Sequence, residues 1–87
     1  TRAKLGRDRL LALRTLSERG PLTDYELADA TGRQQNSIGR RRTDLVRCGL
    51  VEATAERRRT PSGALAIVWT ITTAGQRMLS STLREVE

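Results

Sequence analysis

Three leucines at helical spacing mark the first predicted element. Leu10, Leu13 and Leu16 recur every three residues, so they share one face of a helix. Gly20 and Pro21 follow this run, and both residues end helices readily. The pattern predicts a helix over residues 8–19 that packs over the next two elements.

A second, shorter helix is predicted to begin after Thr23. Glu26 lies three residues beyond Thr23, which is the spacing of a capping box, where each side chain satisfies a free backbone N–H at the helix start. Leu22 precedes the box and can act as a hydrophobic staple or as a one-residue strand against a later sheet. Gly32 can supply the left-handed residue that ends the helix near Thr31.

The third helix is predicted from about Gln35 to Cys48. Ile38 and Leu45 are seven residues apart, so they lie on one inward stripe, and Gly49 ends the helix. Gln34 is a poor N-cap, so the start of this helix is its least well-defined end. The two short helices with a tight turn between them have the form of a helix-turn-helix.

Two strands and a final helix complete the pattern. Residues 50–56 are rich in β-formers, residues 57–63 read Arg-Arg-Arg-Thr-Pro-Ser-Gly, and residues 64–71 alternate large and smaller apolar residues. These features predict a β-hairpin with a charged turn. Thr72 or Thr73 can cap a last helix. Its apolar stripe consists of Met78, Leu79, Leu83 and Val86.

The predicted order of three helices, two strands and a helix is an α+β fold. We expect one domain over residues 1–87, with residues 1–7 as a frayed or flexible basic arm. The chain has no His, and its one cysteine, Cys48, excludes an internal disulfide and a multi-cysteine metal site. Cys48 lies near Leu45 and Leu50 in the pattern, which indicates a half-buried side chain. We therefore expect no enzyme activity, no metal and no cofactor.

Charge is concentrated in one region of the chain. The formal net charge is +6, and residues 33–59 hold eight arginines against three acids. A cationic region of this kind is the electrostatic footprint of a nucleic-acid binder. With Ile38 inward, the opposite face of the third helix presents amide, hydroxyl and guanidinium groups, which suit base edges and phosphates. This face consists of Asn36, Arg40, Thr43 and Arg47.

Over about nine-tenths of its length, in the order of its elements, the chain resembles the winged helix-turn-helix superfamily of bacterial and phage regulators. The resemblance is carried by Cys-Gly-Leu-Val-Glu at the end of the third helix, the basic hairpin, and Val-Trp-Thr-Ile-Thr-Thr-Ala-Gly-Gln-Arg-Met-Leu. It implies that the third helix enters the major groove, while the hairpin, or wing, contacts the adjacent minor groove or backbone. Arg33 and Gln34 depart from the apolar residue and Ser or Asp cap that such domains usually carry.

Carried over by position, the resemblance implies a set of DNA-binding residues on the third helix and the wing. The set is Gln35, Asn36, Ser37, Arg40, Arg41, Thr43, Arg57, Arg58 and Arg59. Consecutive arginines on a helix point about 100° apart, so Arg40, Arg41 and Arg42 cannot all reach DNA. For Arg42 we weigh DNA contact against an ion pair with an acid of the second helix, such as Glu26 or Asp29.

Other residues of this region also have two interpretations. The three wing arginines either contact DNA or form a solvated turn that protects an edge hairpin. Trp69 is expected in the core rather than as a base-stacking platform. Tyr25 either reaches a phosphate or packs on its neighbours.

The predicted function is sequence-specific binding of double-stranded DNA, as a transcriptional regulator or a phage DNA-transaction factor. The alternative is a winged-helix interaction module that docks an acidic protein. The final helix either folds back on the first helix or pairs with a second copy in a homodimer. No apolar run is long enough for a membrane span, so we expect a cytoplasmic location in a bacterial cell or phage-infected host.

Overall fold

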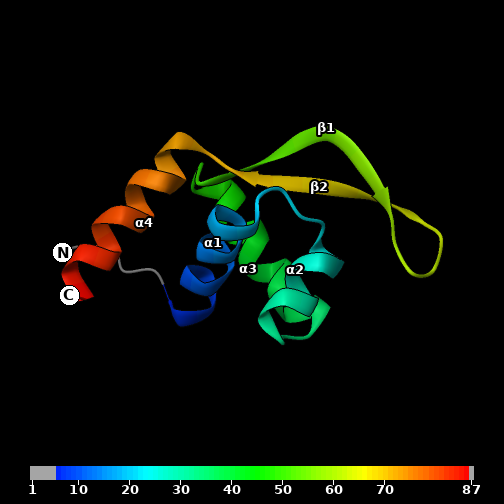
Figure 1. The fold of residues 1–87 in the computed structure, drawn as a ribbon, viewed down its shortest axis with the longest axis horizontal. Coiled ribbons are helices and arrows are strands. Elements are labelled where there is room, and N and C mark those ends of the chain that lie inside the picture. The colour runs from blue at the N-terminus through cyan, green and yellow to red at the C-terminus, as the bar shows by residue number, and fades with distance from the viewer. Residues whose placement is uncertain (1–5, 87) are drawn as a thin grey trace.

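The computed structural model describes the backbone of residues 6–86 and the side chains of residues 6–82. The order of elements agrees with the prediction and is α1 (Arg7–Arg19), α2 (Asp24–Thr31), α3 (Gln35–Arg47), β1 (Val51–Arg59), β2 (Leu65–Ile71) and α4 (Thr73–Val86). Figure 1 shows α1, α2 and α3 bundled at the centre, with the β1–β2 hairpin extending to one side and α4 lying on the other. The fold is α+β, as predicted.

The three-helix bundle is held together by aliphatic side chains from each helix. Leu13 and Leu16 of α1, Leu27 of α2, and Ile38 and Leu45 of α3 are all at most 1% exposed. These residues form one contiguous cluster, which Leu50, Val51 and Leu79 extend toward the hairpin and α4. The inward stripe predicted for the third helix is therefore confirmed, and it leaves the rest of α3 free to face outward.

The helix boundaries follow the predicted caps. The Thr23 hydroxyl accepts from the backbone N–H of Glu26 at 3.2 Å, and Glu26 Oε1 accepts from the backbone N–H of Thr23 at 2.9 Å, so the capping box is confirmed. Gly32 ends α2 in the left-handed conformation. Gln34 is the N-cap of α3 and makes no side-chain capping bond, consistent with its poor rating as a cap.

Arg7, the last residue of the predicted arm, is the first residue of α1, and residues 1–5 lie outside the described residues, so the arm stays a prediction. Two details of the sequence interpretation were wrong. Cys48 is the C-cap of α3, beyond the last helical residue Arg47, and its side chain is exposed rather than half-buried. Arg57, Arg58 and Arg59 belong to β1 rather than to the turn, because their backbones pair with β2.

The hairpin is antiparallel and contains an irregularity near its middle. Ala53 pairs with Trp69 and Arg57 with Ile67, so the residues 54–56 of β1 lie opposite the single residue Val68. Such an insertion bends the strand and increases its twist. The turn is residues 60–64, closed by the backbone N–H of Thr60, which donates to the Ala64 carbonyl at 2.7 Å.

Leu22 attaches the hairpin to the helices. Its backbone N–H donates to the Trp69 carbonyl at 3.0 Å, and its carbonyl accepts from the Trp69 N–H at 2.8 Å. This bridge confirms the predicted one-residue strand. The inner end of β2 is thereby paired on both sides, whereas its outer end extends beyond the bundle (Figure 1).

The start of α4 packs closely on Leu50, in the segment between α3 and β1. The Thr72 hydroxyl accepts from the backbone N–H of Gly75 at 3.0 Å, and the Thr72 backbone N–H donates to the Leu50 carbonyl at 2.9 Å. A methyl group on Gly75 would overlap that carbonyl oxygen. Leu79 is buried in the core and Met78 packs against it, so this part of α4 folds back on the domain. The side chains of Leu83 and Val86 lie outside the described residues.

Candidate nucleic-acid interface

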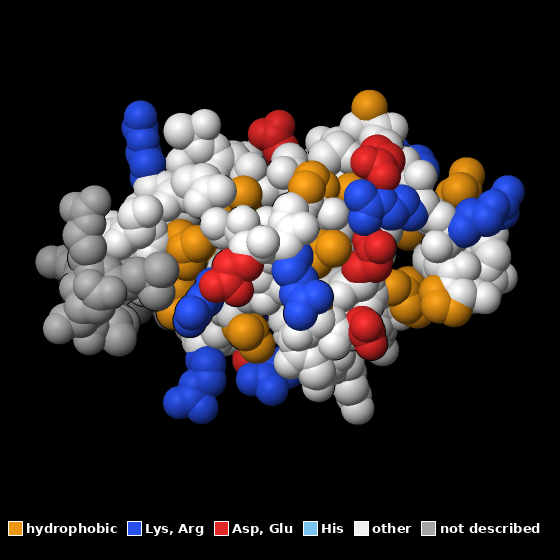
Figure 2. Space-filling view, in the orientation of Figure 1, with side chains coloured by type: hydrophobic (Ala, Val, Ile, Leu, Met, Phe, Trp, Pro, Cys, Tyr) orange, Lys and Arg blue, Asp and Glu red, His pale blue; other side chains and the backbone are white. Residues whose placement is uncertain are grey.

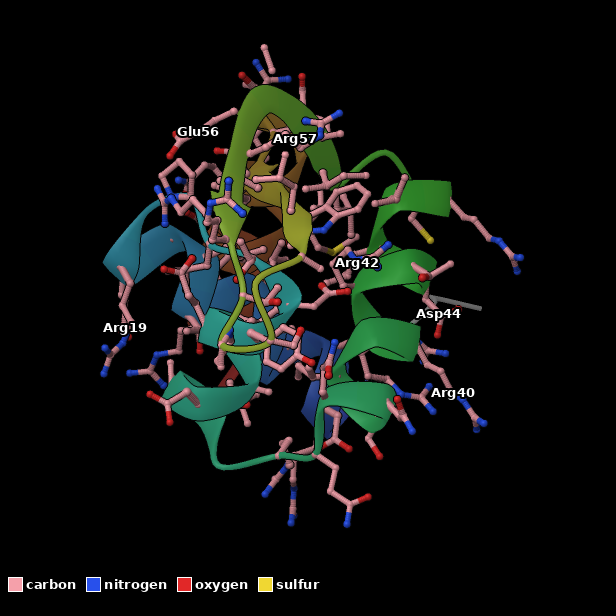
Figure 3. The ribbon with its side chains drawn as sticks, turned by 90° about the vertical axis from the view of Figure 1, so that its right-hand side faces the viewer. Arg19, Arg40, Arg42, Asp44, Glu56 and Arg57 are labelled. Carbon is pink, nitrogen blue, oxygen red and sulfur yellow. The ribbon has the colours of Figure 1, made fainter. Side chains whose placement is uncertain are left out.

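The first turns of α3 present an exposed polar surface. Gln35, Asn36, Ser37 and Arg40 are exposed, and the first turn of α3 holds no acid. Asn36 and Arg40 lie opposite Ile38, whose full burial turns their face of the helix outward. Gln35 and Ser37 are exposed at the first turn. Figure 3 shows Arg40 projecting away from the bundle on the outer side of α3.

Arg41 is only partly available. Its Nη1 donates to Asp44 Oδ2 at 3.3 Å, and its side chain is 34% exposed. Asp44 also accepts from Nε and Nη2 of Arg9 on α1, at 3.0 and 2.8 Å. The sequence analysis missed this α1–α3 link, because Arg9 and Asp44 are 35 residues apart and nothing local connects them.

Arg42 turns toward the hairpin instead of toward solvent. Its Nε and Nη2 donate to the two carboxylate oxygens of Asp24 at 3.0 and 2.6 Å, and its guanidinium stacks on the Trp69 ring, 3.9 Å from the centroid. An ion pair with an acid of the second helix was one of the two interpretations of Arg42, and the structure shows this pair. The partner is Asp24, not Glu26 or Asp29. The contact joins α2, α3 and β2, so it links α3 to the hairpin.

Thr43 uses its hydroxyl within the helix. The hydroxyl donates to the Gly39 carbonyl at 2.8 Å and accepts from Arg42 Nη1 at 3.1 Å, and the side chain is half-buried. Among the predicted α3 residues, Thr43 is therefore the one whose polar atom is most engaged by the protein itself.

Strand alternation separates the three wing arginines. Arg57 pairs with Ile67 and Arg59 with Leu65, so these four side chains share one face of the hairpin, while Arg58 lies on the other. Arg57 Nη1 donates to the carbonyls of Thr54 and Glu56, both at 3.0 Å. In Figure 3 Arg57 and Glu56, which are neighbours on β1, point to different sides of the wing.

Arg58 is held by two acids. Its Nε donates to Glu56 Oε2 at 2.7 Å, and its Nη1 donates to Glu26 Oε1 at 2.8 Å. The hydrogen bond from Arg58 to Glu56, followed by the one to Glu26, raises the pKa of Arg58. Partial burial tends to raise the pKa of Glu26, but the Thr23 backbone N–H and Arg58 outweigh it, so the Glu26 pKa is lowered.

The predicted arginines thus fall into two groups. Arg41, Arg42 and Arg58 are paired with acids of the domain, whereas Arg40, Arg57 and Arg59 make no ion pair with any acid among the described side chains. On the face seen in Figure 2, acidic and basic side chains lie next to one another along the wing, as such pairing requires.

The large apolar side chains of β2 differ in their burial. Trp69 packs against the core, as predicted, but Leu65 is 64% exposed and Ile67 36% exposed, while Val68 on the other face is fully buried. The outer part of the hairpin extends past the bundle, so alternation along β2 does not place these two side chains in the core. Tyr25 is 38% exposed on α2.

The described residues hold neither a metal site nor a membrane-spanning helix. The side chains of residues 6–82 form no group of three or more His, Cys, Asp or Glu that could hold a metal ion. Among the helices of residues 6–86, none has an apolar stretch of membrane-spanning length.

Comparison with solved structures identifies the fold as a winged helix-turn-helix. BpsR from Bordetella bronchiseptica, solved in connection with regulation of its DNA binding by 6-hydroxynicotinic acid, matches 93% of this chain with a TM-score of 0.78 at 17% identity. A MarR family protein from Bacillus stearothermophilus matches 95% with a TM-score of 0.75 at 19% identity. A probable transcriptional regulator from Pseudomonas aeruginosa matches 92% with a TM-score of 0.72 at 26% identity.

The match covers the chain almost entirely but the neighbours only in part. This chain spans 58%, 54% and 57% of those three proteins, respectively. No protein-family model matches the sequence, and no curated protein does either. The similarity therefore shows the winged helix-turn-helix fold, with the element order predicted from the sequence.

Proposed function

We propose that this chain is a sequence-specific double-stranded DNA-binding domain of a transcriptional regulator. The observation that carries the proposal is the exposed, acid-free start of α3, where Gln35, Asn36, Ser37 and Arg40 project from a helix anchored by the buried Ile38. In the proposed complex α3 lies in the major groove, and the wing lies on the adjacent minor groove or backbone.

Each exposed α3 side chain has a chemical role in this proposal. The amides of Gln35 and Asn36 can pair with the N6 and N7 edge of adenine, and the Arg40 guanidinium with O6 and N7 of guanine. The Ser37 hydroxyl suits a phosphate oxygen. Thr43 is placed to offer its methyl group to a thymine methyl, since its hydroxyl already bonds within α3.

The wing supplies contacts that are independent of sequence. Arg57 and Arg59 share a face and make no ion pair with a described acid, so they are the primary phosphate or minor-groove contacts. Arg41 and Arg58 remain in the proposed set, but each must exchange a carboxylate partner for a phosphate. DNA therefore has to replace an ion pair within the domain at Arg41 and Arg58, but not at Arg57 and Arg59.

The solved neighbours support regulation rather than catalysis. The three proteins compared above are described as a protein whose DNA binding is regulated by 6-hydroxynicotinic acid, a MarR family protein and a probable transcriptional regulator. We extend that role to this chain, as a domain that binds DNA without an enzymatic step or a cofactor, in the bacterial cytoplasm. The observed acid pairs of the basic side chains do not specifically favour docking to an acidic protein.

Homodimerisation is part of the proposal. Because Leu79 is buried within the domain, pairing of two copies would use the outer surface or the end of α4 rather than its inner stripe. Two recognition helices about 34 Å apart would read a palindromic site across one turn of DNA. A monomer mass at micromolar concentration in sedimentation equilibrium would exclude this arrangement.

A selection from random duplex DNA, followed by affinity measurements, tests the function. We expect enrichment of a defined motif, and a plot of log affinity against log salt with a slope of roughly −4 to −5, as expected for about five neutralised phosphates. The absence of enrichment together with a flat salt response would contradict the proposal.

A further inference from the structure

We propose that a cleft between the wing and the start of α3 holds one sugar–phosphate strand of the bound duplex, with Leu65 and Ile67 packed against deoxyribose rings. This inference rests on the proposed function. It adds an apolar contact with the sugars, which is neither a hydrogen bond to a base edge nor an ion pair with a phosphate.

The cleft collects the exposed apolar side chains of the domain. Among the described side chains, the large hydrophobic residues that are exposed are Tyr25, Leu65 and Ile67. All three line the same cleft, which also includes Gln35 at the start of α3. Exposed apolar side chains that gather at one place, rather than being scattered singly, are typical of a binding surface.

The apolar side chains of the wing lie directly beside cations. Ile67 is the cross-strand partner of Arg57 and Leu65 that of Arg59, so each pair lies on the same face of the hairpin. One surface of the wing therefore combines aliphatic groups with two guanidinium groups. The occupant that suits this surface carries both apolar groups and negative charges.

The inner wall of the cleft does not repel an anion. Its acid, Asp24, is bound through both carboxylate oxygens by Arg42, whose guanidinium also covers the Trp69 ring. The Asp24 and Arg42 side chains are only 20% and 16% exposed. The negative charge of Asp24 is thus compensated before any ligand arrives.

A DNA strand has the required chemistry and lies in the required place. Its deoxyribose rings present C–H surface, and its phosphates alternate with them along the strand. The cleft includes Gln35, proposed to enter the major groove, and its lining residues Leu65 and Ile67 are the cross-strand partners of Arg59 and Arg57, proposed to contact the flanking backbone. A strand that passes from one contact region to the other crosses the cleft.

The inference is tested with two variants that remove the apolar groups, Leu65→Ser and Ile67→Thr. Each is expected to weaken binding to the selected duplex and to a random duplex alike, by roughly tenfold, because sugar contacts carry no base information. The slope of log affinity against log salt should stay unchanged, since an apolar contact releases no counterion. Ala55→Ser, at an exposed β1 position outside the cleft, serves as the control and should bind normally.

A third variant, Leu65→Lys, changes the salt dependence instead. A lysine placed against the strand should release about one additional counterion, so the slope should become steeper by about 0.9. Circular dichroism melting checks that every variant is folded, and sedimentation checks its association state.

Several outcomes would overturn the inference. Folded Leu65→Ser and Ile67→Thr chains that bind DNA as tightly as the wild type, or a Leu65→Lys slope that does not change, exclude a strand in the cleft while leaving the proposed function intact. Loss of self-association in the same variants would assign the cleft to a second copy of the chain. A wild-type chain that binds no duplex at all would contradict the proposed function itself.

Discussion

One carboxylate oxygen of Glu26 joins the wing to the helix bundle. Glu26 Oε1 accepts from Arg58 Nη1 at 2.8 Å and from the backbone N–H of Thr23 at 2.9 Å. The acid that completes the capping box of α2 therefore also holds β1, through Arg58. Arg58, predicted from its position as a DNA contact, has a structural role in the free domain that its neighbours Arg57 and Arg59 lack.

The charge on Glu26 should make stability depend on pH. The pKa of the Glu26 carboxyl is lowered from the usual 4.5, so the ionised carboxylate stabilises the folded domain at neutral pH. This stabilisation is lost as the pH falls below about 4.5. Glu26→Gln keeps a capping oxygen but removes the charge, and should cost less than about 1 kcal/mol, since the Glu26 side chain is 42% exposed. Urea unfolding of the variant and the wild type between pH 7 and pH 3 measures the effect. The difference between their unfolding free energies should shrink toward acid pH, and a constant difference would contradict a stabilising role of the Glu26 charge.

Arg57 and Arg58 should differ in the salt dependence of DNA binding. Arg57→Ala is expected to reduce the slope of log affinity against log salt by about 0.9, as for a lost phosphate contact. Arg58→Ala should weaken all sequences alike with a smaller change in slope, because Glu26 and Glu56 already balance its charge. Equal slope changes in the two variants would show that DNA displaces both acids from Arg58.

Arg40 should contribute to base preference. Arg40→Ala is expected to weaken binding to the selected motif by about 1 to 3 kcal/mol and to relax the preference at one base position. Arg19→Ala is a matched control, since Arg19 is exposed at the end of α1 and Figure 3 shows it on the opposite side of the molecule from Arg40. Competition binding with single-base substitutions measures the effect, and an unaltered preference would remove Arg40 from the base-reading set.

The Arg42–Asp24 contact should stabilise the domain. Arg42→Met removes the partner of a carboxylate that is only 20% exposed, and should cost about 1 to 3 kcal/mol of unfolding free energy. Replacing both residues, as Arg42→Met with Asp24→Asn, should recover part of the loss, because the unpaired charge is then absent. Denaturant unfolding of the two single variants and the double variant measures the coupling, and simple additivity would show that the pair is not coupled.

Two glycines in helices should respond in opposite ways to alanine. Gly75→Ala places a methyl group against the Leu50 carbonyl and should destabilise the domain by about 1 to 3 kcal/mol or more. Gly39→Ala meets only Asp24 Oδ2 at 3.5 Å, an ordinary contact, and should stabilise α3 by roughly 0.5 to 1 kcal/mol through helix propensity. Thermal melting compares the two, and a neutral Gly75→Ala would mean that α4 can move away from Leu50.

Local features of the sequence were sufficient to predict the elements and their order. The capping pair Thr23 and Glu26, the glycine that ends α2, and the inward pair Ile38 and Leu45 act over a few residues, so their consequences can be read along the chain. The order of three helices, two strands and a helix could likewise be predicted from the sequence. The concentration of arginine on the third helix and the wing could also be seen there.

Tertiary structure alone decided which of those arginines are paired and which apolar side chains stay exposed. Arg42 meets Asp24 and Trp69, and Arg58 meets Glu26, because folding brings α2 against α3 and β1. Alternation along β2 could not show that the hairpin extends past the bundle, which leaves Leu65 exposed. Sequence spacing determines the side of an element on which a residue lies, whereas long-range packing determines what that side meets.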